Sequence, residues 1–245
     1  MSSPPDRPSI SLISKVLSPA VGLWLRSQVE SVEALEFQIE GSDRQILAGY
    51  IPKVAIGAHQ AVYKGFYLSQ IELTGEAIRI NLGQVLKGKP LRLLNVVPIR
   101  GRLWWNETDL NASLQSPLLA NSLADFFSIW LKEFSCLLPE NLAQAMKAPL
   151  ALQEAQAMID HDQVTLKLNW RSTPSVSTTL RTRLRLVSGN QLKLEQPHLW
   201  ACIAGETSFA EMEDYEVELG TDVELQELRL EPGRLWVGGQ INVLP

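Results

Sequence analysis

Hydrophobic and polar positions alternate along much of the chain with a period of two. In the clearest stretch, Leu35, Phe37 and Ile39 alternate with charged or amide side chains, the pattern of a β-strand with one face in water. Residues 71–82 continue it, and a break at Thr74-Gly75-Glu76 predicts a hairpin there. Further strands are predicted at residues 93–105, near 150, and at 164–170, 180–187, 192–194, 217–230 and 235–243. The pattern predicts a meandering antiparallel sheet.

Two segments have helical spacing instead. Ser18-Pro19 and Ser116-Pro117 each place a serine N-cap before a proline at the first helical position. The apolar side chains that follow recur every three or four residues, which predicts two amphipathic helices, and a shorter helix is expected at residues 109–114. The apolar residues are Val21, Trp24, Leu25 and Val32 in the first helix, and Leu119, Leu123, Phe126, Phe127, Trp130, Leu131 and Phe134 in the second.

The length and composition are those of a globular protein with a sizeable core. The chain has 245 residues and 45% hydrophobic side chains, and we expect residues 1–8 to be disordered and residues 9–245 to form one domain. No stretch has the ~20 predominantly apolar residues of a membrane span, and the N-terminus lacks the features of a signal peptide. Two cysteines, Cys136 and Cys202, form no disulfide framework and are expected to be buried. These features predict a cytoplasmic protein.

Charge disfavours two classes of function. The net charge of -5 argues against nucleic-acid binding, which needs a basic patch. Residues 1–100 carry 11 basic and 8 acidic side chains, whereas residues 101–245 carry 11 and 19. Residues 206–231 hold ten of those acids, but they alternate with apolar residues, which favours a solvated strand face over a metal site. No metal ligands are predicted.

Two short motifs suggest catalysis only at first sight. Residues 83–90 nearly spell a phosphate-binding P-loop, but Pro90 stands where that loop needs a hydroxyl and a helix start. Asp160-His161-Asp162 could form an acid–base cluster, yet adjacent strand residues point to opposite faces, and no nucleophile or metal motif accompanies them. A basic loop and a turn are the simpler interpretations. We therefore predict no catalytic residues and no enzyme activity.

Arg181, Arg183 and Arg185 are predicted to share one face of a strand. One interpretation is a solvated outer face paired with acidic residues on the next strand. The other is a binding site for lipid phosphate or an acidic partner. The sequence leaves both open.

Several motifs together resemble a known family. They are Ser18-Pro19-Ala20, Leu47-Ala48-Gly49-Tyr50-Ile51-Pro52, Leu73-Thr74-Gly75, Val85-Leu86-Lys87-Gly88-Lys89-Pro90-Leu91, Thr108-Asp109-Leu110-Asn111-Ala112-Ser113-Leu114, and the closing hairpin of residues 228–235. The chain resembles the LmeA-like phospholipid-binding family in its cyanobacterial form. The resemblance implies an α+β fold similar to tubular lipid-binding proteins, in which a highly curved antiparallel β-sheet wraps around an amphipathic helix and leaves an apolar groove. Such a sheet also agrees with the long alternating strands, because two amphipathic helices are too few to form a layer that covers a broad sheet.

The leading hypothesis is therefore non-enzymatic binding of a phospholipid or glycolipid, as a carrier, a sensor or a peripheral factor at the plasma or thylakoid membrane. Burying ~14 methylenes gives ~11 kcal/mol before ordering costs, so no catalytic group is needed. No cofactor is expected apart from a bound lipid. The predicted acyl groove is lined by Trp24, Leu25, Leu123, Phe126, Phe127 and Trp130, and the predicted headgroup contacts are Lys87, Lys89 and Arg92.

The alternative hypothesis is a protein-interaction or assembly factor at a photosynthetic membrane, without stoichiometric lipid. In that case the arginine strand around Arg183, or the acidic strands of residues 206–231, would bind a protein partner. A continuous apolar cavity would favour lipid binding, whereas a sealed core would favour this alternative.

Overall fold

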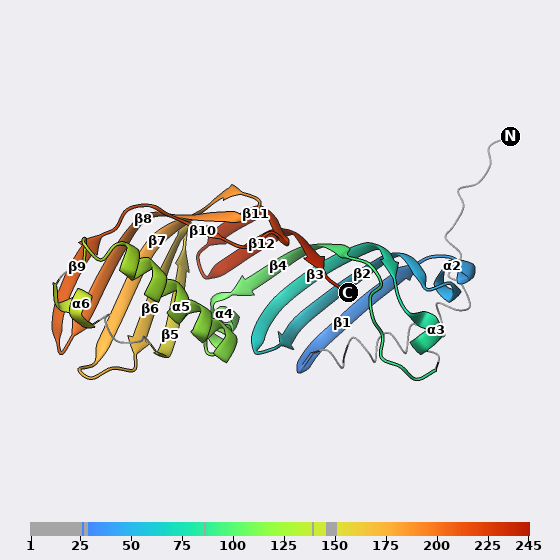
Figure 1. The fold of residues 1–245 in the computed structure, drawn as a ribbon, viewed down its shortest axis with the longest axis horizontal. Helices are drawn as coiled ribbons and strands as arrows, with labels where there is room; N and C mark the ends of the chain where they lie inside the picture. The colour runs from blue at the N-terminus through green and yellow to red at the C-terminus, as the bar shows by residue number, and fades with distance from the viewer. Residues whose placement is uncertain (1–25, 27–28, 86, 139, 146–150) are drawn as a thin grey trace.

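The computed structural model shows an elongated molecule built mainly from antiparallel strands (Figure 1). The structure describes residue 26 and residues 29–85, 87–138, 140–145 and 151–245. The predicted disorder of residues 1–8 and most of the helix predicted after Ser18-Pro19, with Trp24 and Leu25, lie outside these residues. Val32, which was predicted to continue that helix, lies instead in the strand Ser31–Glu40. Within the described residues, strands far outnumber helical segments, which agrees with the predicted antiparallel β-structure.

The first sheet joins the N-terminal half of the chain to its C-terminal end. Its order is β1-β2-β3-β4-β12-β11, and all neighbours are antiparallel. Strand β12 pairs with β4 along its whole length, so segments distant in the sequence share the centre of the sheet. The strands are β1 (Ser31–Glu40), β2 (Tyr50–Tyr63), β3 (Phe66–Arg79), β4 (Val97–Asn106), β11 (Val223–Glu231) and β12 (Arg234–Val243).

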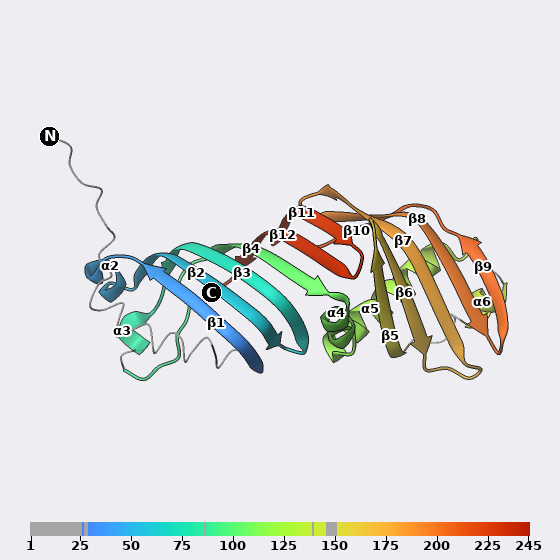
Figure 2. The same cartoon turned by 180° about the vertical axis from the view of Figure 1, so that it is seen from behind.

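The second sheet is formed by the chain between β4 and β11. Its order is β10-β8-β7-β6-β5, with β9 paired to β8. The strands are β5 (Leu152–Asp160), β6 (Gln163–Trp170), β7 (Val176–Ser188), β8 (Gln191–Ile203), β9 (Glu206–Glu211) and β10 (Tyr215–Glu218). The prediction of one sheet is therefore wrong. Helices interrupt the chain after β4, and β5 to β10 pair among themselves before β11 and β12 return to the first sheet (Figure 2).

The helices lie at the ends and the junction of the sheets. They are α2 (Asp43–Leu47), α3 (Leu82–Val85), α4 (Glu107–Leu114), α5 (Pro117–Glu133) and α6 (Glu140–Ala145). The Asn106 side chain caps α4 by accepting from the Asp109 amide at 2.7 Å, and Ser116 Oγ caps α5 by accepting from the Leu119 amide. The start predicted at Ser116-Pro117 is confirmed, and α4 begins two residues before the predicted residue 109. Helix α5 crosses one face of the second sheet (Figures 1 and 2).

The predicted hairpin at Thr74-Gly75-Glu76 is wrong, because β3 runs straight through it. A Cβ on Gly75 would lie 2.7 Å from Ile99 Cδ1 on the neighbouring strand. The glycine therefore permits close packing between strands and makes no turn. The hairpin that precedes β3 turns at Lys64 and Gly65, which both have positive φ. Cys136 also differs from expectation, because it lies exposed.

The two sheets meet at a seam between β11 and the second sheet. The Leu225 amide donates to the Gly189 carbonyl, and the Gly233 amide donates to the Ile159 carbonyl at 2.9 Å. Ile159, Val164 and Leu230 form a buried cluster there, with Leu110 of α4 packed against it. Helix α4 therefore covers the junction, and α5 continues from it along the second sheet (Figure 1).

Candidate functional site

One face of the first sheet is apolar from edge to edge, and we call it the apolar face. Strand register aligns three neighbouring rows of residues across all six strands, and the side chains of each row point to the same side. The middle row is Phe37, Ile56, Leu73, Gly101, Gly239 and Leu225. The rows on either side are Ile39, Val54, Gly75, Ile99, Ile241 and Val223, and Leu35, Ala58, Ile71, Leu103, Val237 and Leu228.

Within the described residues, a helix packs at each end of the apolar face. At one end, Leu82 of α3 packs on Ile51, Ile78 and Val97 in a small buried cluster. At the other end, α4 is tied to β3, because Ser69 Oγ donates to Asp109 Oδ2 at 2.6 Å. All residues of the middle row keep partial exposure. A contiguous, partly exposed apolar surface of this kind is typical of a binding site for an apolar ligand.

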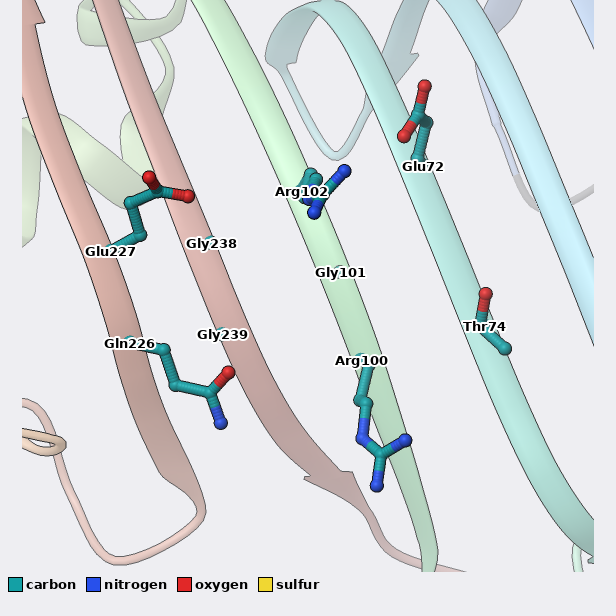
Figure 3. Close-up of a pocket in the computed structure, with 9 residues that line it drawn as sticks. All are labelled: Glu72, Thr74, Arg100, Gly101, Arg102, Gln226, Glu227, Gly238 and Gly239. Atoms are coloured by element: carbon teal, nitrogen blue, oxygen red, sulfur yellow. The ribbon is translucent and has the colours of Figure 1, made fainter.

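The opposite face of the same strands is mainly polar, apart from Trp104 and Trp236, whose ring centroids lie 5.3 Å apart. A shallow hollow of about 380 Å³ lies there, over Gly238, with Glu72 and Arg102 on adjoining strands and Arg100 and Gln226 further along (Figure 3). Within the described residues, neither arginine side chain makes a hydrogen bond or an ion pair. The first sheet therefore separates a solvated face from an apolar one, which is expected when only one face contacts an apolar partner.

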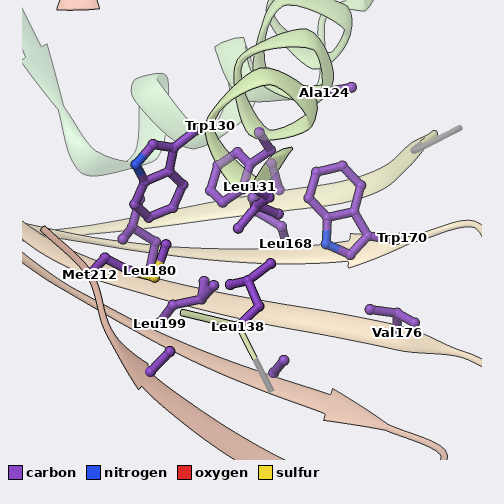
Figure 4. Packing of buried hydrophobic residues seen from close by; sticks show 14 of the residues in the cluster. Ala124, Trp130, Leu131, Leu138, Leu168, Trp170, Val176, Leu180, Leu199 and Met212 are labelled. Atoms are coloured by element: carbon purple, nitrogen blue, oxygen red, sulfur yellow. The ribbon is translucent and has the colours of Figure 1, made fainter. Parts of the chain in front are cut away.

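The side chains of α5 that were predicted to line the acyl groove form a close-packed cluster on the second sheet. Phe127 and Trp130 are both 0% exposed, whereas Leu123 and Phe126 pack on the same cluster and stay partly exposed. Phe127 contacts Trp170 edge to face at 5.6 Å between ring centroids. Figure 4 shows Trp130 and Trp170 on either side of Leu131 above the strands. This is the geometry of a protein core.

Tyr215 of β10 closes one side of this cluster. Its ring packs on Phe126, Trp130 and Phe134 at centroid distances of 6.1, 6.5 and 5.9 Å. Burial raises the pKa of the Tyr215 phenol, and the charge of Glu133 raises it further. The Trp130 Nε1 hydrogen is buried without an acceptor among the described residues. The apolar surroundings of the cluster therefore disfavour the ionised form of the Tyr215 phenol.

The predicted headgroup residues lie far from the predicted acyl residues. Lys87, Lys89 and Arg92 are exposed in the connection from α3 to β4, at the opposite end of the molecule from α5 (Figure 1). They instead adjoin one end of the apolar face, where α3 packs. The structure therefore does not combine the two predicted halves of the site. The basic loop predicted for residues 83–90 is correct only in part, because residues 83–85 belong to the short helix α3.

The remaining motifs meet at the seam. His161 and Asp162 form the β5–β6 turn, as expected, and with Arg183, Arg185 and Arg229 they line an open hollow of about 760 Å³. Arg185 pairs with Glu195 at 3.3 Å, which supports a solvated strand face paired with acidic neighbours. Charges of both signs line this hollow, so it favours no ion of one sign.

The apolar face was missed by sequence analysis, although its alternating residues were visible. Leu35, Phe37 and Ile39 were assigned to a strand correctly, but periodicity does not tell which strands pair. Only the register of β12 on β4 brings Val237 and Ile241 beside Leu103 and Ile99. No local signal in the sequence reports this pairing.

The fold and the site define an antiparallel β-protein that presents an extended apolar face on one side of a curved sheet (Figure 2). A family model described as LmeA-like phospholipid-binding matches residues 9–240, and the chain belongs to this family. Comparisons with curated proteins and with solved structures gave no match. Among the helices of the described residues, none combines the length and hydrophobicity needed to cross a membrane.

Proposed function

We propose that this protein binds a phospholipid without transforming it, and that the acyl chains lie on the apolar face of the first sheet. The single observation that carries the proposal is the set of three apolar rows across six strands, with its middle row partly exposed. Membership of a phospholipid-binding family supports lipid as the ligand. A glycolipid carries the same kind of acyl chain, and the experiment below distinguishes a bound phospholipid from a bound glycolipid.

The free energy of such binding is sufficient without any catalytic group. Each buried methylene contributes about 0.8 kcal/mol, so a single acyl chain of ~14 methylenes contributes ~11 kcal/mol before ordering costs. The rows supply branched side chains such as Ile56, Leu73 and Val237, which pack well against a flexible hydrocarbon. Apolar burial alone thus explains useful affinity.

The apolar face is preferred over the α5 cluster for a geometric reason. A lipid chain between α5 and the second sheet would have to displace Phe127 and Trp130, which have no exposed surface. On the first sheet, a chain can cover side chains that are already partly exposed. The role predicted for Leu123, Phe126, Phe127 and Trp130 stays a prediction, and the variants below separate the two locations.

The experiment is native mass spectrometry of the purified protein, followed by solvent extraction and identification of the lipid. The test variant is Ile71→Gln with Leu73→Gln, which places amides on the apolar face. The matched control is Glu72→Gln with Thr74→Gln, which changes the alternate residues of the same strand on the polar face. Circular dichroism establishes that each variant folds, and Phe37→Gln on the edge strand β1 provides a second test.

We expect wild-type protein and the control to carry one phospholipid, and the test variants to lose it. The extracted headgroup tells phospholipid from glycolipid. Wild-type protein that is free of lipid and takes none from vesicles would overturn the proposal, and a partner captured through the arginine strand would then favour the alternative function. Retention of lipid by both folded test variants would place the acyl chains elsewhere.

A further inference from the structure

We propose that the connection between β3 and β4 (described at residues 80–85 and 87–96) is the part of the molecule that docks on a bilayer, and that the bilayer surface it fits is anionic. The inference rests on the proposed function and extends it. It states which end of the apolar face lies next to the membrane from which the lipid is taken. It rests on charge, exposed apolar side chains and the rigidity of the connection.

The charge of this region has one sign. Between Glu76 and Glu107 the sequence contains six basic residues and no acidic one. Lys87, Lys89 and Arg92 are exposed, and within the described residues their side chains make no hydrogen bond or ion pair. Three cations without counterions at one end of a molecule of net charge -5 complement an anionic surface.

Apolar side chains project from the same end. Leu94 is 60% exposed and Val96 is 46% exposed, directly after the basic residues. Leu47 of α2 is 57% exposed, and α2 adjoins the connection because the Ile80 amide donates to the Gly49 carbonyl at 2.9 Å. Lysines and arginines beside exposed aliphatic side chains suit the boundary of a membrane, where headgroups and acyl chains meet.

The connection is held in a fixed shape. Asn81 is only 8% exposed, and its Oδ1 accepts from the Arg92 amide at 2.8 Å while its Nδ2 donates to the Pro90 carbonyl at 3.0 Å. The Leu94 amide also donates to the Arg79 carbonyl at 2.8 Å. A surface that is ordered before binding loses little conformational entropy when it docks.

The position of the connection relates docking to lipid binding. Leu82, at the start of α3, packs on Val97 and Ile78 at one end of the apolar face, and Leu91 and Leu93 pack against the same cluster. When the molecule docks with Lys87 and Lys89 on the lipid headgroups, this end of the apolar face, near α3, lies next to the bilayer (Figure 1). A lipid would move between two neighbouring apolar environments.

The test is flotation of the full-length protein with vesicles. One set contains phosphatidylglycerol and phosphatidylcholine in equal parts, and the other contains phosphatidylcholine alone. The charge variant is Lys87→Gln with Lys89→Gln and Arg92→Gln. The matched control, Arg181→Gln with Arg183→Gln and Arg185→Gln, removes the same charge from the outer face of β7. A third variant, Leu94→Ser with Val96→Ser, removes the apolar contacts.

We expect wild-type protein to float with the anionic vesicles, less so as salt rises, and to stay behind with phosphatidylcholine alone. The charge variant should lose on the order of a hundredfold in partitioning, the serine variant should also lose partitioning, and the β7 control should bind as wild type does. Equal binding to both vesicle types, or loss in the β7 control but not in the charge variant, would overturn the docking proposal.

Native mass spectrometry of the same samples separates this proposal from the proposed function. Wild-type protein that carries lipid but does not float would overturn docking and leave lipid binding intact. Protein that floats with the vesicles only when Lys87, Lys89 and Arg92 are intact, but never carries lipid, would support docking and overturn the proposed function.

Discussion

The buried side chain of Asn81 accepts a hydrogen bond from the backbone amide of Arg92 at 2.8 Å, which closes the connection between β3 and β4 at its base. The same side chain donates to Pro90. The Asn81 side chain therefore links the start of the connection to Pro90 and Arg92 near its end, and the shape of the proposed docking surface depends on these two hydrogen bonds.

Asn81→Ala should destabilise the protein by about 1–3 kcal/mol, because it removes the side-chain partners of the part-buried Arg92 amide and Pro90 carbonyl. It should also open the connection locally, so that trypsin cuts faster after Lys87 and Arg92. The Lys89-Pro90 bond resists trypsin in any case, which gives an internal reference. Asn121→Ala on the exposed side of α5 is the control and should change the free energy of unfolding by less than ~0.5 kcal/mol. Unchanged proteolysis in Asn81→Ala would contradict this role.

Gly49→Ala should destabilise the turn between α2 and β2. Gly49 has a φ of +77°, and an added Cβ would lie 2.5 Å from the Ile80 carbonyl oxygen. The left-handed backbone alone costs roughly 1–2 kcal/mol for alanine, and the contact with Ile80 adds to it. Gly57→Ala in β2 is the control, since nothing lies within 4 Å of its added Cβ. Denaturant titration checks both, and equal stabilities would refute the prediction.

Phe127→Ala should cost about 3–5 kcal/mol, as expected for a large side chain removed from a closed core. The protein that remains folded should still carry lipid, because the apolar face is untouched. Ile129→Ala, on the exposed side of the same helix at 62% exposure, should be nearly neutral. The reverse pattern, with stability kept and lipid lost in Phe127→Ala, would instead support an acyl groove under α5.

Tyr215 should ionise above the ordinary range for a tyrosine, because burial raises its pKa and Glu133 adds to the effect. Folding therefore favours the neutral phenol. The stability that this contributes is fully present below the pKa of the unfolded state and is lost as pH rises through the folded-state pKa. The difference in absorbance at alkaline pH between wild type and Tyr215→Phe reports this ionisation. Glu133→Gln should lower the pKa part of the way, and a difference curve at the ordinary tyrosine range would contradict the assignment.

Local features of the structure could be predicted from the sequence. Ser116-Pro117 begins helix α5 as its residue types indicated, because capping depends on neighbours within one turn. Leu35, Phe37 and Ile39 alternate in β1 as expected. The prediction of a turn at Gly75 was wrong, because a glycine needed for close packing has the same local signature as one needed for a turn.

The site itself depends on contacts between distant segments. The middle row of the apolar face draws residues from β1 to β4 and from β11 and β12, and only tertiary pairing aligns Phe37 with Leu225. The same pairing separates Lys87 from Phe127, which the sequence analysis had assigned to one groove. Hydrophobic periodicity indicates which positions are apolar, but it does not tell a closed core from a binding face.

The central claim is that acyl chains contact the apolar face, and quenching by spin-labelled phospholipid tests it most directly. In a background of Cys136→Ser and Cys202→Ser, a bimane fluorophore is attached at Leu73→Cys, on the apolar face, or at Thr74→Cys, on the polar face of the same strand. Phospholipids labelled along the acyl chain should quench the fluorophore at position 73 strongly and at position 74 weakly. Equal quenching at the two positions, or quenching only at a fluorophore placed at Phe126→Cys on α5, would contradict the account.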